Sequence, residues 1–243
     1  MAASSTAIPD TNPHNDGRGE DEPLLGRAGD ASQQDGRGLQ FNFFLGTAVV
    51  AQAGIWILTA VVWASVFNAD LILFSAHPLL NSAGLLVVTQ AIIVLQPTHT
   101  QKQKTQGTYV HSALNGIGMG SLIAGLVIIE YNKIGHGGTH FVSPHAILGL
   151  ITYILFFIQT IVGITQYYTP SLYGSVNKAK SLYKYHRASG YVILILSLAT
   201  VAAATQTDFA KGVLKLQLWP VLVAAVITLA GVLPRIKKQK LGL

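Results

Sequence analysis

Six apolar segments dominate the sequence and decide what the chain can fold into. They cover roughly residues 41–67, 71–95, 108–131, 142–167, 185–204 and 216–233. Most come close to the ~20 residues that an α-helix needs to cross a bilayer, and none alternates as a membrane barrel strand would. Charged residues make up only 11% of the chain, against roughly 25% in soluble domains. We therefore expect an all-α membrane protein with six transmembrane helices.

The two ends of the chain differ from this apolar part. Residues 1–38 are rich in Gly, Asp, Ser, Gln and Asn and hold too few large apolar side chains to fold. We expect a disordered tail over 1–38, one helical domain over 39–235 and a basic tail over 236–243. The stretch from Glu20 to Leu25 is similar to an acidic dileucine sorting signal, which favours an endosomal or vacuolar membrane. A pattern this short also arises by chance.

Lysines and arginines are distributed unequally between the two sides of the membrane. If both termini share one side, the other side keeps only Lys133, Lys211 and Lys215 of the 16 basic residues. The positive-inside rule then places both termini in the cytoplasm. The same asymmetry explains the net charge of +6 without nucleic acid as a partner, and it allows contact with acidic lipid head groups of the bilayer.

Four histidines lie near the ends of four successive apolar segments: His77, His111, His145 and His186. Ionisable side chains inside a membrane are costly and indicate function. In the expected topology His77 and His145 lie near the outer face, while His111 and His186 lie near the cytoplasmic face. The helices of each pair would stand diagonally across a four-helix bundle and leave a gap that a flat macrocycle could fill.

Haem is the cofactor that such pairs suit, because its iron accepts two axial nitrogens and needs no thiolate. The chain has no cysteine, which excludes disulfides and covalent haem attachment. Glycines close to the four histidines would make room for the rings: Gly84, Gly118, Gly149 and Gly190. We therefore expect two haem b groups, with the axial iron ligands His77 and His145 for one and His111 and His186 for the other.

Three other interpretations remain open at this point. A single membrane histidine more often packs through hydrogen bonds than binds a metal. A divalent-cation transporter would add carboxylates to its histidines, yet the carboxylates here lie in the tail, in loops or at helix ends, as with Asp70, Glu130 and Asp208. A haem-bearing anchor that passes electrons to or from a peripheral enzyme or a quinone is the main alternative function.

The histidines lie within recognisable short motifs. These are Phe74-Ser75-x-His77-Pro78, His111-x-x-Leu114, Ser143-x-His145, and Leu182-Tyr183 through Tyr185-His186-x-x-Ser189-Gly190. In this order and spacing the sequence resembles the cytochrome b561 family of six-helix di-haem transmembrane reductases, over about residues 41–235. The resemblance implies the same two histidine pairs.

The resemblance also implies an activity. In that family electrons pass from cytosolic ascorbate through the inner and outer haems to an acceptor such as ferric iron or monodehydroascorbate, and members are often homodimers. An oxidoreductase of this type is therefore expected. Members that use ascorbate have an arginine-containing aromatic stretch where this chain reads Ile92-Ile93-Val94-Leu95-Gln96-Pro97, and this departure leaves the reductant open.

Candidate substrate residues lie on both faces. On the cytoplasmic side Lys104, Lys180, Lys184 and Arg187 are close in sequence to His111 or His186, and such cations can hold haem propionates or an anionic reductant. On the outer side His140 precedes His145 and could contact a metal acceptor. Topological anchoring explains the cations equally well, and a solvated loop explains His140.

Overall fold

The computed structural model of this chain describes residues 31–237, 240 and 241. The dileucine-like stretch and most of the expected N-terminal tail lie outside the described residues. The part of the chain that is described contains helices and no β-strand. In order, the elements are η1 (Leu39–Phe43), α1 (Ala48–Phe67), η2 (Leu73–Ser75), α2 (Ala76–Leu95), α3 (Gln101–Gly135), α4 (Pro144–Tyr168), η3 (Pro170–Tyr173), α5 (Val176–Ser181), α6 (Tyr183–Ala204), α7 (Asp208–Gly212), α8 (Leu218–Val232) and η4 (Leu233–Arg235).

Six of these helical stretches are long and apolar enough to cross a membrane. They are α1, α2 with η2, α3, α4, α5 with α6, and α8 with η4. The expectation of six transmembrane helices is therefore confirmed, and the protein is a multi-pass integral membrane protein.

Two helix boundaries differ from the apolar segments. α3 has 35 residues and begins at Gln101, several residues before the apolar stretch, because Thr100 caps it: the Thr100 hydroxyl accepts a hydrogen bond from Gln103 N–H at 3.2 Å. α1 begins at Ala48 rather than near residue 41, because the short helix η1 ends at Phe43 and a turn with Gly46 at a positive φ of 57° separates the two helices.

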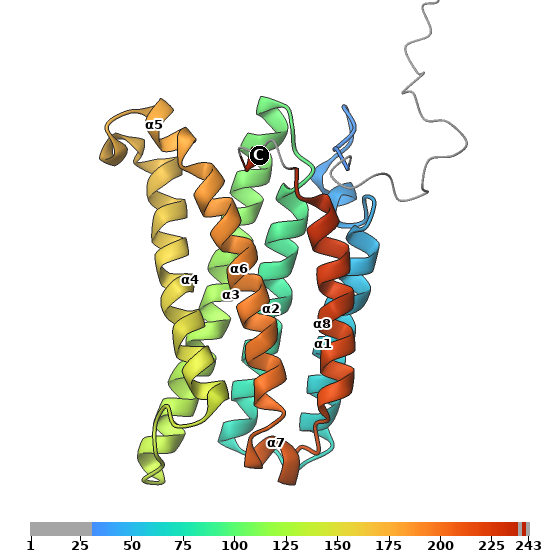
Figure 1. Cartoon of the computed structure of the whole chain (residues 1–243), viewed down its shortest axis with the longest axis vertical. Helices are drawn as coiled ribbons and strands as arrows, with labels where there is room; N and C mark the ends of the chain where they lie inside the picture. The colour runs from blue at the N-terminus through green and yellow to red at the C-terminus, as the bar shows by residue number, and fades with distance from the viewer. Residues whose placement is uncertain (1–30, 238–239, 242–243) are drawn as a thin grey trace, which may run out of the picture.

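The helices pack mainly as three pairs: α1 with α8, α2 with α3, and α4 with α6. In Figure 1 these pairs stand side by side, with α4 at one edge and the α1–α8 pair at the other. The described chain starts and finishes at the same end of the bundle, beside η1 and η4 (Figure 1). We call this end the terminal face and the end that carries η2 and α7 the opposite face.

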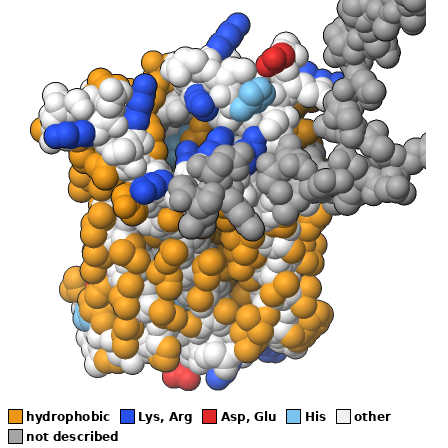
Figure 2. Space-filling view, turned by 45° about the horizontal axis from the view of Figure 1, so that its top comes forward, with side chains coloured by type: hydrophobic (Ala, Val, Ile, Leu, Met, Phe, Trp, Pro, Cys, Tyr) orange, Lys and Arg blue, Asp and Glu red, His pale blue; other side chains and the backbone are white. Residues whose placement is uncertain are grey.

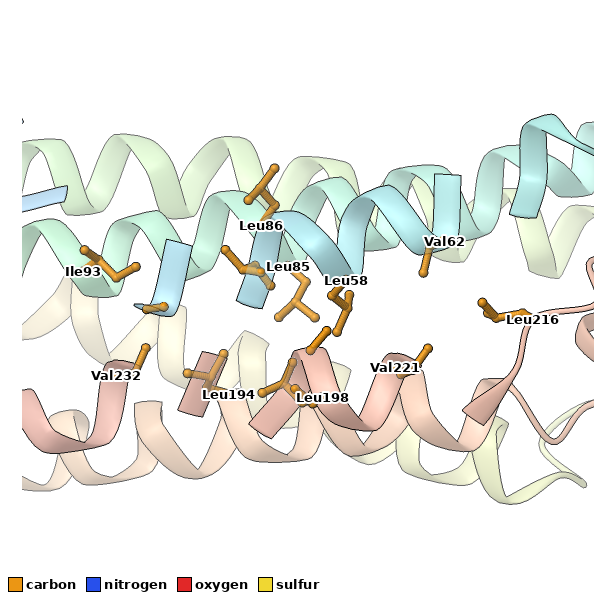
Figure 3. Packing of buried hydrophobic residues seen from close by; sticks show 14 of the residues in the cluster. Leu58, Val62, Leu85, Leu86, Ile93, Leu194, Leu198, Leu216, Val221 and Val232 are labelled. Carbon is orange, nitrogen blue, oxygen red and sulfur yellow. The ribbon is translucent and has the colours of Figure 1, made fainter. Parts of the chain in front are cut away.

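Interdigitating aliphatic side chains join the pairs. Leu58 of α1, Leu85 of α2, Leu194 of α6 and Val221 of α8 belong to one buried cluster (Figure 3). A second cluster joins α2, α3, α4 and α6 through Val88, Met119, Phe156 and Ile193, with Leu122 beside them. Helices in lipid associate by packing of this kind, since lipid tails are as apolar as leucine.

Glycines allow the closest helix contacts. A Cβ added at Gly231 of α8 would lie 2.1 Å from the backbone nitrogen of Ala51 on α1. Between α2 and α3, a Cβ on Gly84 would lie 3.0 Å from the carbonyl oxygen of Gly118, and the reverse contact is 3.1 Å. Gly84 and Gly118 thus bring two helices together, which corrects the expectation that they make room for a haem ring.

Gly231→Ala is expected to destabilise the protein, because the added methyl group meets backbone that cannot move aside without separating α1 from α8. Overpacking of this kind costs about 1–3 kcal/mol. Gly120→Ala is the matched control, since a Cβ there meets nothing within 4 Å. Thermal unfolding in detergent should show a lower Tm for Gly231→Ala alone, and equal values for the two variants would contradict the tight α1–α8 contact.

Arg235 closes the terminal face between three helices. Its side chain is only 2% exposed, and it donates hydrogen bonds to the Gln96 side chain at 2.9 Å, to the Ile93 carbonyl at 3.1 Å and to the Leu45 carbonyl. These acceptors include carbonyl groups at the end of α2, where a cation is favoured by the helix dipole. Arg235 is thus a buried structural residue.

Candidate functional site

His77 and His145 meet near the opposite face. They occupy the first turns of α2 and α4, next to Pro78 and Pro144, where proline suits the start of a helix. Their ring centroids are 6.1 Å apart and the ring planes are at 84°. The sequence-based prediction that these two side chains come together is supported by this geometry.

His111 and His186 lie toward the terminal face, on α3 and α6, and interact electrostatically with each other. The ring of His186 packs against Gly163 of α4, where an added Cβ would lie 2.8 Å from His186 Cε1. A glycine at this position is therefore what allows the His186 ring to fit between α4 and α6. The two pairs lie at two depths of the same bundle.

Three of the four histidines are oriented by a carbonyl group of the helix that packs beside them. His77 Nδ1 lies 2.9 Å from Gly125 O, His111 Nδ1 lies 2.8 Å from Ala91 O, and His145 Nδ1 lies 3.0 Å from Thr200 O. A carbonyl accepts, so each Nδ1 carries the proton and Nε2 keeps a free lone pair. Metal-bound histidines typically show this arrangement.

His186 is the exception. Its Nδ1 is buried and has no hydrogen-bond partner within the described residues. A buried nitrogen left without a hydrogen-bond partner is costly. The described residues offer no such partner to His186 Nδ1. An unpartnered buried nitrogen of this kind suits a residue that takes part in binding a further group.

Amide side chains fix the backbone at three of the histidines, and the sequence reasoning had not identified them. Asn81 donates to His77 O at 2.8 Å, and Asn115 donates to His111 O at 2.8 Å. Gln159 of α4 donates to His186 O of α6 at 2.6 Å. The repeated spacing His-x-x-x-Asn in α2 and α3 could have indicated the first two, because residues four apart share a helix face.

Tyr153 links α4 to the His77 site. Its hydroxyl lies within hydrogen-bonding distance of Asn81 Oδ1, at 2.5 Å, and of the Leu122 carbonyl, at 2.8 Å. Asn81 also approaches His77 Nδ1 at 3.1 Å. The chain Tyr153–Asn81–His77 therefore ties α4, α2 and α3 together beside one histidine pair.

The separation of His77 and His145 would suit an iron held between the two rings. An iron bound at ~2 Å to one nitrogen of each ring keeps two imidazole centroids ~6 Å apart, and the centroids of His77 and His145 are 6.1 Å apart. Within the described residues, no three His, Cys, Asp or Glu side chains gather as a metal cluster.

The predicted cations of the terminal face lie in different surroundings. Arg187 donates a hydrogen bond to the carbonyl of Lys240, and Lys104 interacts electrostatically with the same Lys240. Lys180 lies on α5, which Figure 1 shows above α4 and away from the C-terminus. Lys184 places its ammonium group 5.0 Å from the ring centroid of Tyr185. Figure 2 shows the Lys and Arg side chains gathered at this end, above a hydrophobic band.

His140 lies on the opposite face in contact with an acidic side chain. Its Nδ1 is 2.5 Å from Glu130 Oε2, and both side chains are partly exposed. Nearby, Lys133 donates a hydrogen bond to the Thr139 carbonyl at 2.8 Å. Glu130 and Lys133 both interact electrostatically with His77, so this group lies close to the His77–His145 pair.

A family comparison covers the segment that carries the histidines. The model of a family described as "Eukaryotic cytochrome b561" matches residues 76–211. This range holds all four histidines and the α2–α3 and α4–α6 pairs, and it leaves out α1 and α8. It is more than half of the 243 residues.

Individual relatives show the same likeness. The sheep (Ovis aries) "Transmembrane ascorbate-dependent reductase CYB561" is 26% identical over 164 residues, 66% of this chain and 62% of that protein. The human (Homo sapiens) protein of that name is 26% identical over 165 residues, with the same shares. The maize (Zea mays) "Ascorbate-specific transmembrane electron transporter 2" is 27% identical over 172 residues, 67% of this chain and 70% of that protein. The chain thus spans less than two thirds of the mammalian relatives.

Proposed function

The chain belongs to the cytochrome b561 family, and we propose from this premise that it moves single electrons across a membrane through two non-covalent haem b groups. Haem b iron alternates between the ferric and ferrous states and so exchanges one electron at a time. The observation that carries the proposal is the His77–His145 pair, whose spacing and Nδ1 hydrogen bonds suit two axial ligands.

Each histidine has a defined role in this proposal. His77 and His145 would supply Nε2 lone pairs near the opposite face, while their Nδ1–H groups donate to the carbonyls of Gly125 and Thr200. This hydrogen bond fixes the tautomer and raises the basicity of the ligating nitrogen. His111 and His186 would hold the second haem near the terminal face.

The terminal face is proposed to be cytoplasmic. Among the described residues, this face carries all lysines and arginines except Lys133, Lys211 and Lys215, as the positive-inside rule requires of a cytoplasmic side. Its cations would attract an anionic reductant such as ascorbate, the donor named in the sheep and maize relatives. Electrons would then travel from the His111–His186 pair to the His77–His145 pair.

The acceptor is proposed to be ferric iron rather than an anion. The exposed Glu130–His140 pair offers a carboxylate and an imidazole, which are ligands for a metal cation, and it lies near His77. A carboxylate at this place disfavours an anionic acceptor such as monodehydroascorbate, whereas Lys133 favours it. Comparing the rates of reoxidation by a ferric chelate and by monodehydroascorbate tests whether Glu130 or Lys133 has the larger effect on the acceptor.

The proposed function is tested by redox titration of the purified full chain loaded with haem. Ascorbate should reduce the protein, and a ferric chelate added next should reoxidise it without any partner protein. A haem-bearing anchor would instead react with small molecules only when its partner enzyme or a quinone is present. Absence of reduction by ascorbate would overturn the proposed donor.

Gly163→Val should disturb only one of the two haems. A Cβ at Gly163 would lie 2.8 Å from His186 Cε1, so a branched side chain must displace the ring. We expect the spectral change of Gly163→Val to match that of His186→Ala. Gly149→Ala is the control on the same helix, since its Cβ meets Thr200 at an ordinary 3.7 Å. A Gly163→Val spectrum identical to wild type would contradict ligation by His186.

A further inference from the structure

Two described lysines after Arg235 make contacts at the terminal face. After the buried Arg235, Lys237 donates a hydrogen bond to Ser32. Lys240 then donates to the carbonyl of Thr98, in the turn between α2 and α3, at 2.7 Å. Two lysines expected to belong to a basic tail are thereby fixed on the bundle.

This segment lies beside the inner histidine pair. Arg187, which follows His186 in the chain, donates to the carbonyl of Lys240. Lys104 interacts electrostatically with Lys240 and precedes His111 by two helical turns. Lys240 therefore meets two cations, Lys104 and Arg187, from the helices that carry His111 and His186.

The cations around Lys240 repel its ammonium group, and a bound anion would offset this repulsion. Burial, followed by the charges of Lys237, Arg187 and Lys104, lowers the pKa of Lys240 to about 8. Asp35, a described carboxylate of the terminal face, faces His99 and accepts a hydrogen bond from Gln103. Lys240 donates to a neutral carbonyl instead. A bound anion would lower the free energy of the cluster through charge-assisted hydrogen bonds.

We propose that Lys240 is the third cation of the reductant site and that it binds an anionic enediol together with Lys104 and Arg187. The inference rests on the proposed function and extends it to a residue outside the segment that defines the family.

The test compares Lys240→Gln and Lys240→Arg in the full haem-loaded chain. Reduction is followed by stopped flow at low salt in a neutral detergent, which removes acidic lipid as a competing anion. Lys240→Gln should raise the ascorbate concentration for half-maximal rate about fivefold to tenfold, the effect of losing one charge-assisted contact, while the maximal rate stays near wild type. Reduction by a neutral hydroquinone should be unchanged. Lys211→Gln, on the opposite face, is the matched control.

The pH dependence separates binding from anchoring. A lysine is charged below its pKa, so in wild type the apparent affinity for ascorbate should fall as pH rises through about 8. Lys240→Arg should keep its affinity above this pH, because a guanidinium does not lose its proton there. Lys240→Gln should lack the transition altogether.

Three results would overturn the inference in distinguishable ways. If Lys104→Ala weakens ascorbate binding and Lys240→Gln does not, Lys240 is an anchor only and the proposed function stands. If the neutral hydroquinone slows equally in Lys240→Gln, the residue acts through structure and not through charge. If ascorbate fails to reduce even the wild type, the proposed donor and this inference fall together.

Discussion

His77→Ala and His145→Ala are expected to remove the same haem, and His111→Ala and His186→Ala the other. Each pair would bind one iron from both sides, so either substitution leaves that iron with a single protein ligand. Each variant should therefore lose about half of the bound haem, because one of the two proposed haems has then lost one of its two histidine ligands. The low-spin absorbance spectra of the four purified variants should fall into two classes.

A histidine outside the pairs provides the control. His136 is exposed, and its Nδ1 contacts the Asn132 carbonyl at the end of its own helix, so His136→Ala should keep both haems. If His77→Ala gave the spectrum of His111→Ala, the pairing at two depths would be wrong. If His145→Ala kept both haems, the 6.1 Å contact between the two rings would be packing and not ligation.

The arrangement of the helices could be predicted from the sequence because the membrane imposes it. Only helices satisfy their own backbone hydrogen bonds in lipid, so apolar segments of sufficient length determine the number of spans. The depth of a histidine then follows from its place in its segment, which is how His77 and His145 were expected to meet. Their role as haem ligands remains a prediction.

The supporting residues around the histidines could not be predicted, because they belong to other helices. Tyr153 and Gln159 reach from α4 to Asn81 and to the backbone of α6, and Gly163 matters only through its contact with the His186 ring. Nothing in the local sequence of α4 indicates which neighbouring helix it faces. Relative helix rotation decides these contacts, and it is set by packing across the whole bundle.

The terminal segments make contacts that composition does not indicate. The tails predicted over 1–38 and 236–243 remain a prediction, and within the described residues Gln33 is buried, with its N–H donating to the Pro97 carbonyl at 3.0 Å. Asn42 donates to the Gln33 side chain at 3.0 Å. Polar segments can pack in this way when helix ends offer unpaired carbonyl groups. Lys180 and Arg187 are alike in charge and close in sequence. Lys180 lies on the short helix α5, whereas Arg187 on α6 donates a hydrogen bond to the Lys240 carbonyl.

The number of haem groups bound per chain tests the central claim most directly. The purified, fully loaded full chain should be assayed for haem by the pyridine haemochrome method and for protein by amino-acid analysis. Acidic acetone should extract all of the haem, because the chain has no cysteine to hold it covalently. The account predicts two haem b per chain, one for each histidine pair. One haem per chain at saturation, or none, would contradict it.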